Sequence, residues 1–113
     1  RAWWEEDRGV TQRFYNQVLG AWGDAPYFCE PWICEQVVAM HLKSPAMLTV
    51  LPLQDWLAMD GELRRENPNE ERINVPANSR HYWRYRMHLS LEELLKANNL
   101  NAMIRQKIAE SGR

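Results

Sequence analysis

Two polar side chains follow the most apolar segment of the chain. Residues 46–53 read Ala-Met-Leu-Thr-Val-Leu-Pro-Leu, and Gln54 and Asp55 come directly after them. An apolar run of this length next to a proline is typical of a strand buried on both faces in a parallel sheet. The carboxyl ends of such strands face the ligand crevice of α/β folds. Gln54 and Asp55 therefore belong either to a binding site or to the cap of a short helix that follows.

A second segment interleaves arginines with aromatic residues. Residues 80–86 read Arg-His-Tyr-Trp-Arg-Tyr-Arg, and they follow a loop that carries Arg72 and Asn74. Arginine and aromatic side chains stack on nucleic-acid bases or pack against sugar rings. The same alternation is typical of a short strand with one core face and one ion-paired face. The pattern alone leaves both interpretations open.

The cysteines and histidines form no recognisable catalytic or metal-binding pattern. Cys29 and Cys34 are five residues apart, which is not a metal or redox spacing, and we expect two buried reduced thiols. His41, His81 and His88 have no second ligand at metal-binding spacing. The chain also has no glycine-rich phosphate loop. We therefore predict no metal site and no cofactor.

Helices are expected to position most of these residues. Residues 2–19 show helical spacing, with Thr11 as an internal N-cap. Pro31 suits the first position of a second helix, because its missing N–H would be unpaired there. Ser90 and Glu93 form a capping-box pattern at the start of a later helix.

The expected fold class is α/β, with a chain that is itself mostly helical. Residues 46–53 and 82–87 are the one or two short strands, and residues 60–80 form a long polar loop. A helix followed by a buried strand is the repeating step of an α/β fold.

Composition limits the classes of function. The chain has 113 residues, 45% of them hydrophobic, and no apolar run long enough to span a membrane. Lys and Arg number 14 against 15 Asp and Glu, and this balance lacks the basic excess of general nucleic-acid binders. The chain opens Arg-Ala-Trp-Trp without an initiator methionine. Because adjacent tryptophans need cover, we expect a piece of a longer protein.

Three separated motifs resemble the C-terminal end of the 4-alpha-glucanotransferases, the amylomaltase or disproportionating enzymes of starch and glycogen metabolism. The motifs are Leu51–Asp55, Arg72–Asn78 and His81–Met87, with further similarity at Trp3–Glu6 and Glu30–Trp32. Ala77 stands where many members carry a glycine, and His81-Tyr82 stands where many carry Gly-Asn. This departure looks like the branch that has starch-binding modules ahead of its catalytic domain.

The resemblance implies a (β/α)8 TIM barrel as the parent fold. A complete barrel needs about 250 residues, so residues 1–113 would form its C-terminal segment, with the last outer helix, the final strand and the closing helices. The family's chemistry is retaining transglycosylation by two carboxylates about 5–5.5 Å apart. By resemblance both lie on earlier strands, and a third aspartate lies just before Arg1. No catalytic residue is then expected within this chain, which alone would be inactive.

By resemblance, four residues bind substrate: Gln54, Asp55, Asn74 and Pro76. The implied partners are maltooligosaccharides and α-1,4-glucans from starch or glycogen, in a cytoplasmic enzyme without nucleic-acid or membrane contacts. The isolated chain is expected to self-associate. The alternative is a small non-enzymatic module that binds single-stranded RNA or carbohydrate through its Arg/aromatic segment, and the net charge of −1 counts against RNA.

Overall fold

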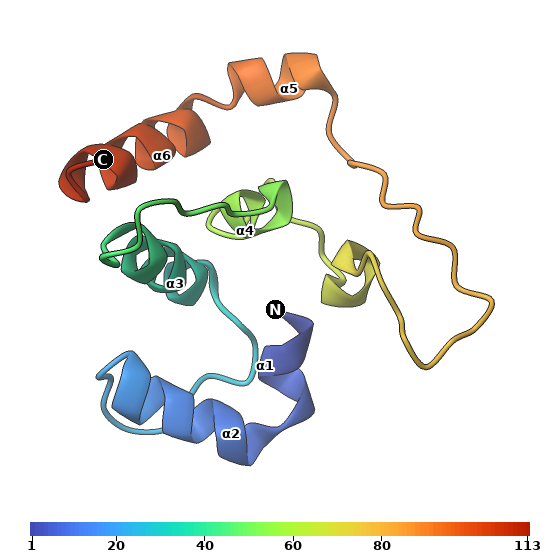
Figure 1. The fold of residues 1–113 in the computed structure, drawn as a ribbon, viewed down its shortest axis with the longest axis horizontal. Helices are drawn as coiled ribbons and strands as arrows, with labels where there is room; N and C mark the ends of the chain where they lie inside the picture. The colour runs from blue at the N-terminus through green and yellow to red at the C-terminus, as the bar shows by residue number, and fades with distance from the viewer.

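A computed structural model describes residues 1–113, and about half of them are helical (Figure 1). The elements are α1 (Ala2–Glu6), α2 (Arg8–Arg13), a π-helical turn η1 (Phe14–Val18), α3 (Pro31–Leu42), α4 (Leu53–Leu57), a 3-10 helix η2 (Pro68–Glu71), α5 (Leu91–Lys96) and α6 (Asn98–Glu110). The structure contains no β-strand. None of its helices has the length and apolar character of a membrane span.

The predicted N-terminal helix is divided, but not where the sequence suggested. The break is at Asp7, whose carboxylate accepts a hydrogen bond from the Val10 N–H at 3.1 Å and caps α2. The prediction of Thr11 as the N-cap is wrong. Thr11 is fully buried inside α2, and its hydroxyl donates to the Trp4 carbonyl at 2.7 Å. Thr11 therefore joins α1 to α2 instead of starting a helix.

Other helix-end predictions are confirmed. Pro31 occupies the first position of α3. The Ser90 hydroxyl accepts from the Glu93 N–H at 3.1 Å, and the Glu93 carboxylate accepts from the Ser90 N–H at 2.6 Å. Gly20, just after η1, has a φ of 66°, a left-handed conformation that suits glycine.

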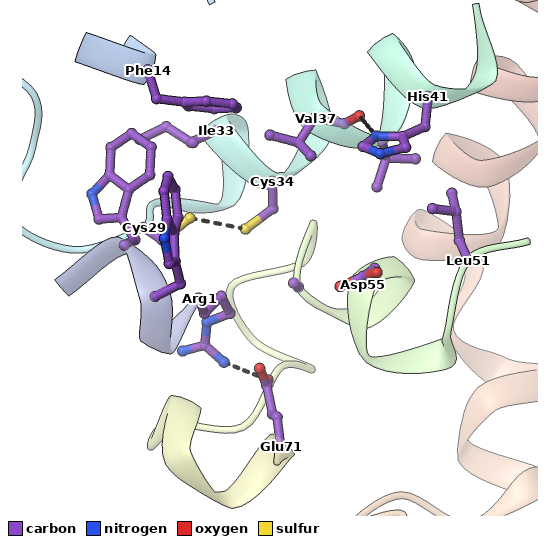
Figure 2. Close-up of a pocket in the computed structure, with 14 residues that line it drawn as sticks. Arg1, Phe14, Cys29, Ile33, Cys34, Val37, His41, Leu51, Asp55 and Glu71 are labelled. Carbon is purple, nitrogen blue, oxygen red and sulfur yellow. Dashed lines mark hydrogen bonds and ion pairs between the residues drawn. The ribbon is translucent and has the colours of Figure 1, made fainter. Parts of the chain in front are cut away.

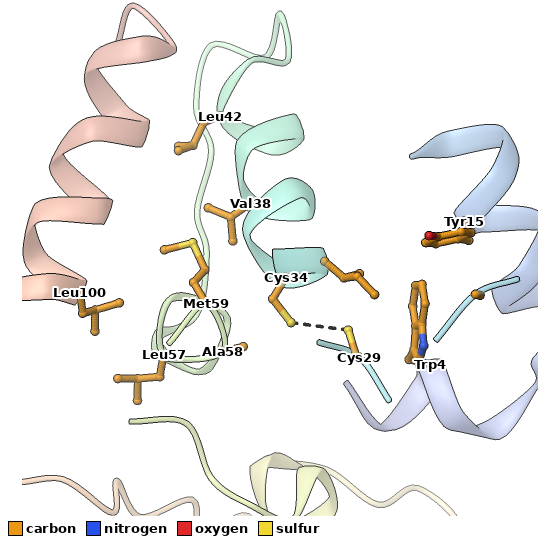
Figure 3. Packing of buried hydrophobic residues seen from close by; sticks show 12 residues of the cluster. Trp4, Tyr15, Cys29, Cys34, Val38, Leu42, Leu57, Ala58, Met59 and Leu100 are labelled. Atoms are coloured by element: carbon orange, nitrogen blue, oxygen red, sulfur yellow. Dashed lines mark hydrogen bonds between the residues drawn. The ribbon is translucent and has the colours of Figure 1, made fainter. Parts of the chain in front are cut away.

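Helix α3 is the centre of the core (Figure 3). Its buried side chains are Ile33, Cys34, Val38 and Leu42. Leu57, Ala58 and Met59, in and just after α4, and Leu100 from α6 are buried with them, as are Trp4 and Tyr15 from the N-terminal helices. The core thus joins segments from both ends of the chain.

Polar contacts hold the C-terminal helix against α3. Lys107 of α6 forms an ion pair with Glu35 of α3 at 2.7 Å. The Arg113 guanidinium donates to the carbonyls of Leu42 at 2.6 Å and Ala46 at 2.7 Å. These bonds fix the chain where α3 ends and the apolar segment begins.

Residues 46–53 form no strand in this chain, so that prediction is wrong here. Met47 is 99% exposed and Val50 81% exposed, instead of being buried on both faces. The physical reason is that a strand exists only through hydrogen bonds to a neighbouring strand, and no neighbour is present. The end of the apolar run becomes helical, with Pro52 as the N-cap of α4 and Leu53 as its first residue.

The strand predicted at residues 82–87 is also absent. This segment belongs to an extended arc that runs between η2 and α5 along the edge of the molecule (Figure 1). Tyr85 and Met87 are half-buried while Arg84 and Arg86 are exposed, so the alternation survives in part. Because no second strand pairs with it, the segment is extended without being a strand.

Candidate functional site

A polar groove of about 480 Å³ lies between α1, the start of α4 and the segment after η2. Its lining residues are Arg1, Ala2, Trp3, Glu6, Pro52, Gln54, Asp55, Pro68, Glu71, Arg72, Ile73 and Asn74. Gln54 and Asp55 stand in the first turn of α4, and Asn74 lies in the extended chain three residues beyond η2. The fold thus brings together three of the four predicted binding residues. Pro76 is exposed and does not line the groove.

Two ion pairs build the walls of the groove. Arg1 pairs with Glu71 at 2.6 Å and donates to the carbonyl of Arg65 at 2.7 Å. Arg72 pairs with Glu6 across the groove. These bonds dock part of the predicted polar loop onto α1. No local pattern marks Arg1, Glu6 or Glu71 as site residues, because 66 or 70 positions separate them from their partners.

The groove is chemically suited to a neutral polyhydroxylated ligand. The Gln54 and Asn74 amides can each accept from one hydroxyl and donate to another. Trp3 is 47% exposed and adds a flat apolar surface. Burial raises the pKa of the Asp55 carboxyl above its ordinary value.

A smaller, mostly apolar cavity of about 200 Å³ adjoins the groove (Figure 2). It shares Arg1, Trp3, Asp55 and Glu71 with the groove. Figure 2 shows Asp55 on α4 opposite the face of α3 that carries Cys34 and His41. His41 is exposed, and its Nδ1 lies 2.8 Å from the Val37 carbonyl oxygen. Asp55 therefore stands where the two hollows meet.

The two cysteines are buried free thiols, as predicted, but their side chains are in contact. Their sulfurs lie 3.5 Å apart. Cys29 precedes the N-cap of α3 and Cys34 is its fourth residue. Side chains at these two positions commonly pack together at a helix start. The sequence signal for this contact was therefore the position of the two cysteines at a helix start, and not a metal or redox spacing.

The Arg/aromatic segment lies apart from the groove. None of residues 80–86 lines it. Arg84 stacks over the Tyr82 ring at 5.1 Å, and Trp83 is exposed. No three His, Cys, Asp or Glu side chains gather as a metal-binding cluster. The Arg/aromatic segment therefore contributes nothing to the groove.

Comparison with known proteins identifies the family. The profile of the 4-alpha-glucanotransferase family matches residues 1–92. The whole chain aligns with the rice 4-alpha-glucanotransferase DPE2 at 41% identity, and the aligned part makes up 12% of the length of that protein. About 90% of the chain aligns with 19% of the length of the 4-alpha-glucanotransferases of Chlamydia muridarum, at 29% identity, and Chlamydia caviae, at 30%. No solved structure matches the chain. The chain thus spans less than a fifth of these relatives, and it belongs to the 4-alpha-glucanotransferase family.

Proposed function

We propose that the protein containing this chain transfers α-1,4-glucan segments between maltooligosaccharides with retention of configuration. The substrates are maltooligosaccharides and glucans derived from starch or glycogen, and the enzyme acts in the cytoplasm. Membership of the family supports the reaction. The main observation in support of a substrate-binding role for this chain is the groove. Gln54, Asp55 and Asn74 line it together, although they come from two segments.

We further propose that residues 1–113 are the C-terminal segment of a catalytic (β/α)8 barrel. Residues 46–53 would be the final strand, with neighbouring strands of the whole enzyme supplying its hydrogen bonds. The exposure of Met47 and Val50 supports this assignment, because apolar side chains of a barrel strand need neighbours to cover them. The catalytic carboxylates come from outside these residues, so residues 1–113 alone have no transfer activity.

Within the enzyme, the amides of Gln54 and Asn74 bind vicinal hydroxyls of the glucan. Each amide can form two hydrogen bonds at once, which orients a sugar ring. Pro76 restricts the backbone two residues beyond Asn74 and thereby limits the conformations of that loop. The carboxylate of Asp55 accepts hydrogen bonds at the mouth of the strand and orders the loops around it.

The test uses full-length enzyme with single alanine substitutions. Gln54→Ala and Asn74→Ala should each raise KM for maltotriose about three- to tenfold, because one neutral hydrogen bond contributes about 0.5–1.5 kcal/mol. The matched controls are Gln36→Ala on the solvent face of α3 and Asn69→Ala on η2, since both side chains are exposed and outside the groove. Unchanged KM and kcat in both groove variants would contradict glucan binding there.

Binding of single-stranded RNA has no support from the family match or the relatives. The groove also disfavours a phosphate backbone. Its three carboxylates, from Glu6, Asp55 and Glu71, outnumber the two guanidinium groups of Arg1 and Arg72, and both guanidinium groups are already paired with carboxylates.

A further inference from the structure

The fold places the two cysteines of the chain in contact, and the proposed glucan transfer uses neither of them. Cys29 lies in the coil before α3 and Cys34 in the first turns of the helix, so the helix start itself sets their contact (Figure 3). Their sulfurs are 3.5 Å apart. Closing this gap to the disulfide length of about 2.05 Å needs a movement of roughly 1.5 Å. Because Cys29 is in coil, that movement does not require α3 to unwind.

The surroundings of the pair favour a thiolate on one sulfur. Arg64 donates to the Cys29 carbonyl at 2.7 Å, which places its positive charge near the pair. A hydrogen bond from Cys29 holds the pKa of Cys34 below its ordinary value, whereas the same bond and burial raise the pKa of Cys29. The positive end of the α3 dipole acts in the same direction on Cys34.

The two thiols are buried, and a cavity lies beside them. Both cysteines line the apolar cavity. The same cavity is lined by Trp3, His41 and Asp55, all of which reach solvent. A reactive cysteine needs a favoured thiolate and access from solvent. The cavity would supply that access.

We propose that Cys29 and Cys34 form a redox-active dithiol that low-molecular-weight disulfides, such as glutathione disulfide, oxidise to an intramolecular disulfide. The Cys34 thiolate attacks one sulfur of glutathione disulfide, and the S–S bond breaks to release one glutathione thiolate. Cys29 then loses its proton and attacks the Cys34 sulfur, which displaces the second glutathione thiolate. The two released thiolates take up the two protons lost by the cysteines, so two cysteine thiols are oxidised and one glutathione disulfide is reduced.

The test uses the full-length protein in glutathione redox buffers, followed by alkylation of free thiols and tryptic mapping. Trypsin cuts after Arg13 and Lys43, and the peptide Phe14–Lys43 between them holds both cysteines of the chain. Oxidation should remove two hydrogens from this peptide and prevent its alkylation, whatever the state of cysteines elsewhere in the protein. Dithiothreitol should restore two alkylated cysteines.

Two serine variants assign the roles of the sulfurs. Cys29→Ser should stop at a glutathione adduct on Cys34, and Cys34→Ser should react more slowly, because burial still raises the pKa of its remaining thiol. The wild-type result decides the proposal even if a variant folds poorly. Full alkylation of both cysteines after oxidation, a persistent glutathione adduct on the wild-type peptide, or equal oxidation of native and urea-unfolded protein would each overturn it.

Discussion

Asp55 is one of four residues that line both the polar groove and the apolar cavity. Burial raises the pKa of its carboxyl, so the folded protein disfavours the charged form. A carboxylate whose charge destabilises the fold needs another reason for its position, and the ligand-binding role that we propose for Asp55 supplies one.

The pH dependence of stability tests this cost. The folded-state pKa of Asp55 is raised, so its unfavourable contribution is absent below the unfolded pKa of about 3.9 and is fully present above the folded pKa. Asp55→Asn should therefore raise the free energy of unfolding slightly at neutral pH, by less than about 1 kcal/mol because solvent still reaches the side chain. This gain in the free energy of unfolding should vanish at about pH 3.

Thermal unfolding of the full-length protein across this pH range is the measurement. Asp24→Asn, which removes an exposed carboxylate outside both hollows, controls for the change in net charge. A gain in stability that is equal at acidic and neutral pH would show that burial of the Asp55 charge is not its cause.

At the scale of elements, α5 depends on its cap more than on its packing. None of its residues is fully buried, and Leu91 and Leu95 are exposed. The reciprocal bonds between Ser90 and Glu93 satisfy two backbone N–H groups that would otherwise lack partners in the helix. These bonds lower the pKa of Glu93.

Ser90→Ala should destabilise α5 by about 1 kcal/mol, within the usual range for loss of an N-cap. Hydrogen exchange at the amides of residues 91–96 should accelerate about fivefold as a result. Because folding lowers the pKa of Glu93, the ionised Glu93 carboxylate stabilises the fold above about pH 4.3, and this stabilisation is lost as pH falls through the folded-state pKa.

Ser79→Ala is the matched control for the cap. Ser79 is exposed in a turn of the extended arc and caps no helix. Exchange at residues 91–96 that is equally fast in the Ser79 and Ser90 variants would show that α5 does not rely on this cap.

The molecule as a whole is less compact than a typical domain of its length. Its radius of gyration is 15.2 Å, against about 13 Å for a compact domain of this size. Only 13 of the 113 residues are buried, while Met47, Leu48 and Val50 are largely exposed in the segment before α4. An apolar segment with unpaired backbone groups is prone to pair with another chain.

We expect the isolated chain to self-associate at micromolar concentration. Pairing of residues 46–53 between copies, or exchange of helices, would cover side chains whose burial contributes about 1.5–3 kcal/mol each. Sedimentation velocity over a dilution series should show a mass that falls with dilution, and Val50→Lys should shift the equilibrium towards monomer. A compact monomer with a cooperative melt would contradict this expectation.

The amino-acid sequence by itself determined the family and the starts of two helices. The motif around Gln54 and Asp55 and the motif around Asn74 carried the family resemblance that the comparisons confirm. Pro31 and the Ser90 capping box were predictable because a helix end depends on residues a few positions apart. Such signals need no knowledge of the rest of the fold.

Only the tertiary structure decided the outcomes that depend on distant partners. Residues 46–53 have the composition of a strand, yet a strand needs the backbone of another segment, and this chain offers none. The groove exists because Arg1 meets Glu71, a pairing across 70 positions that no local pattern encodes. The contact between Cys29 and Cys34 is an intermediate case. The start of α3 was predictable from Pro31, but the 3.5 Å between the two sulfurs is known only from the structure.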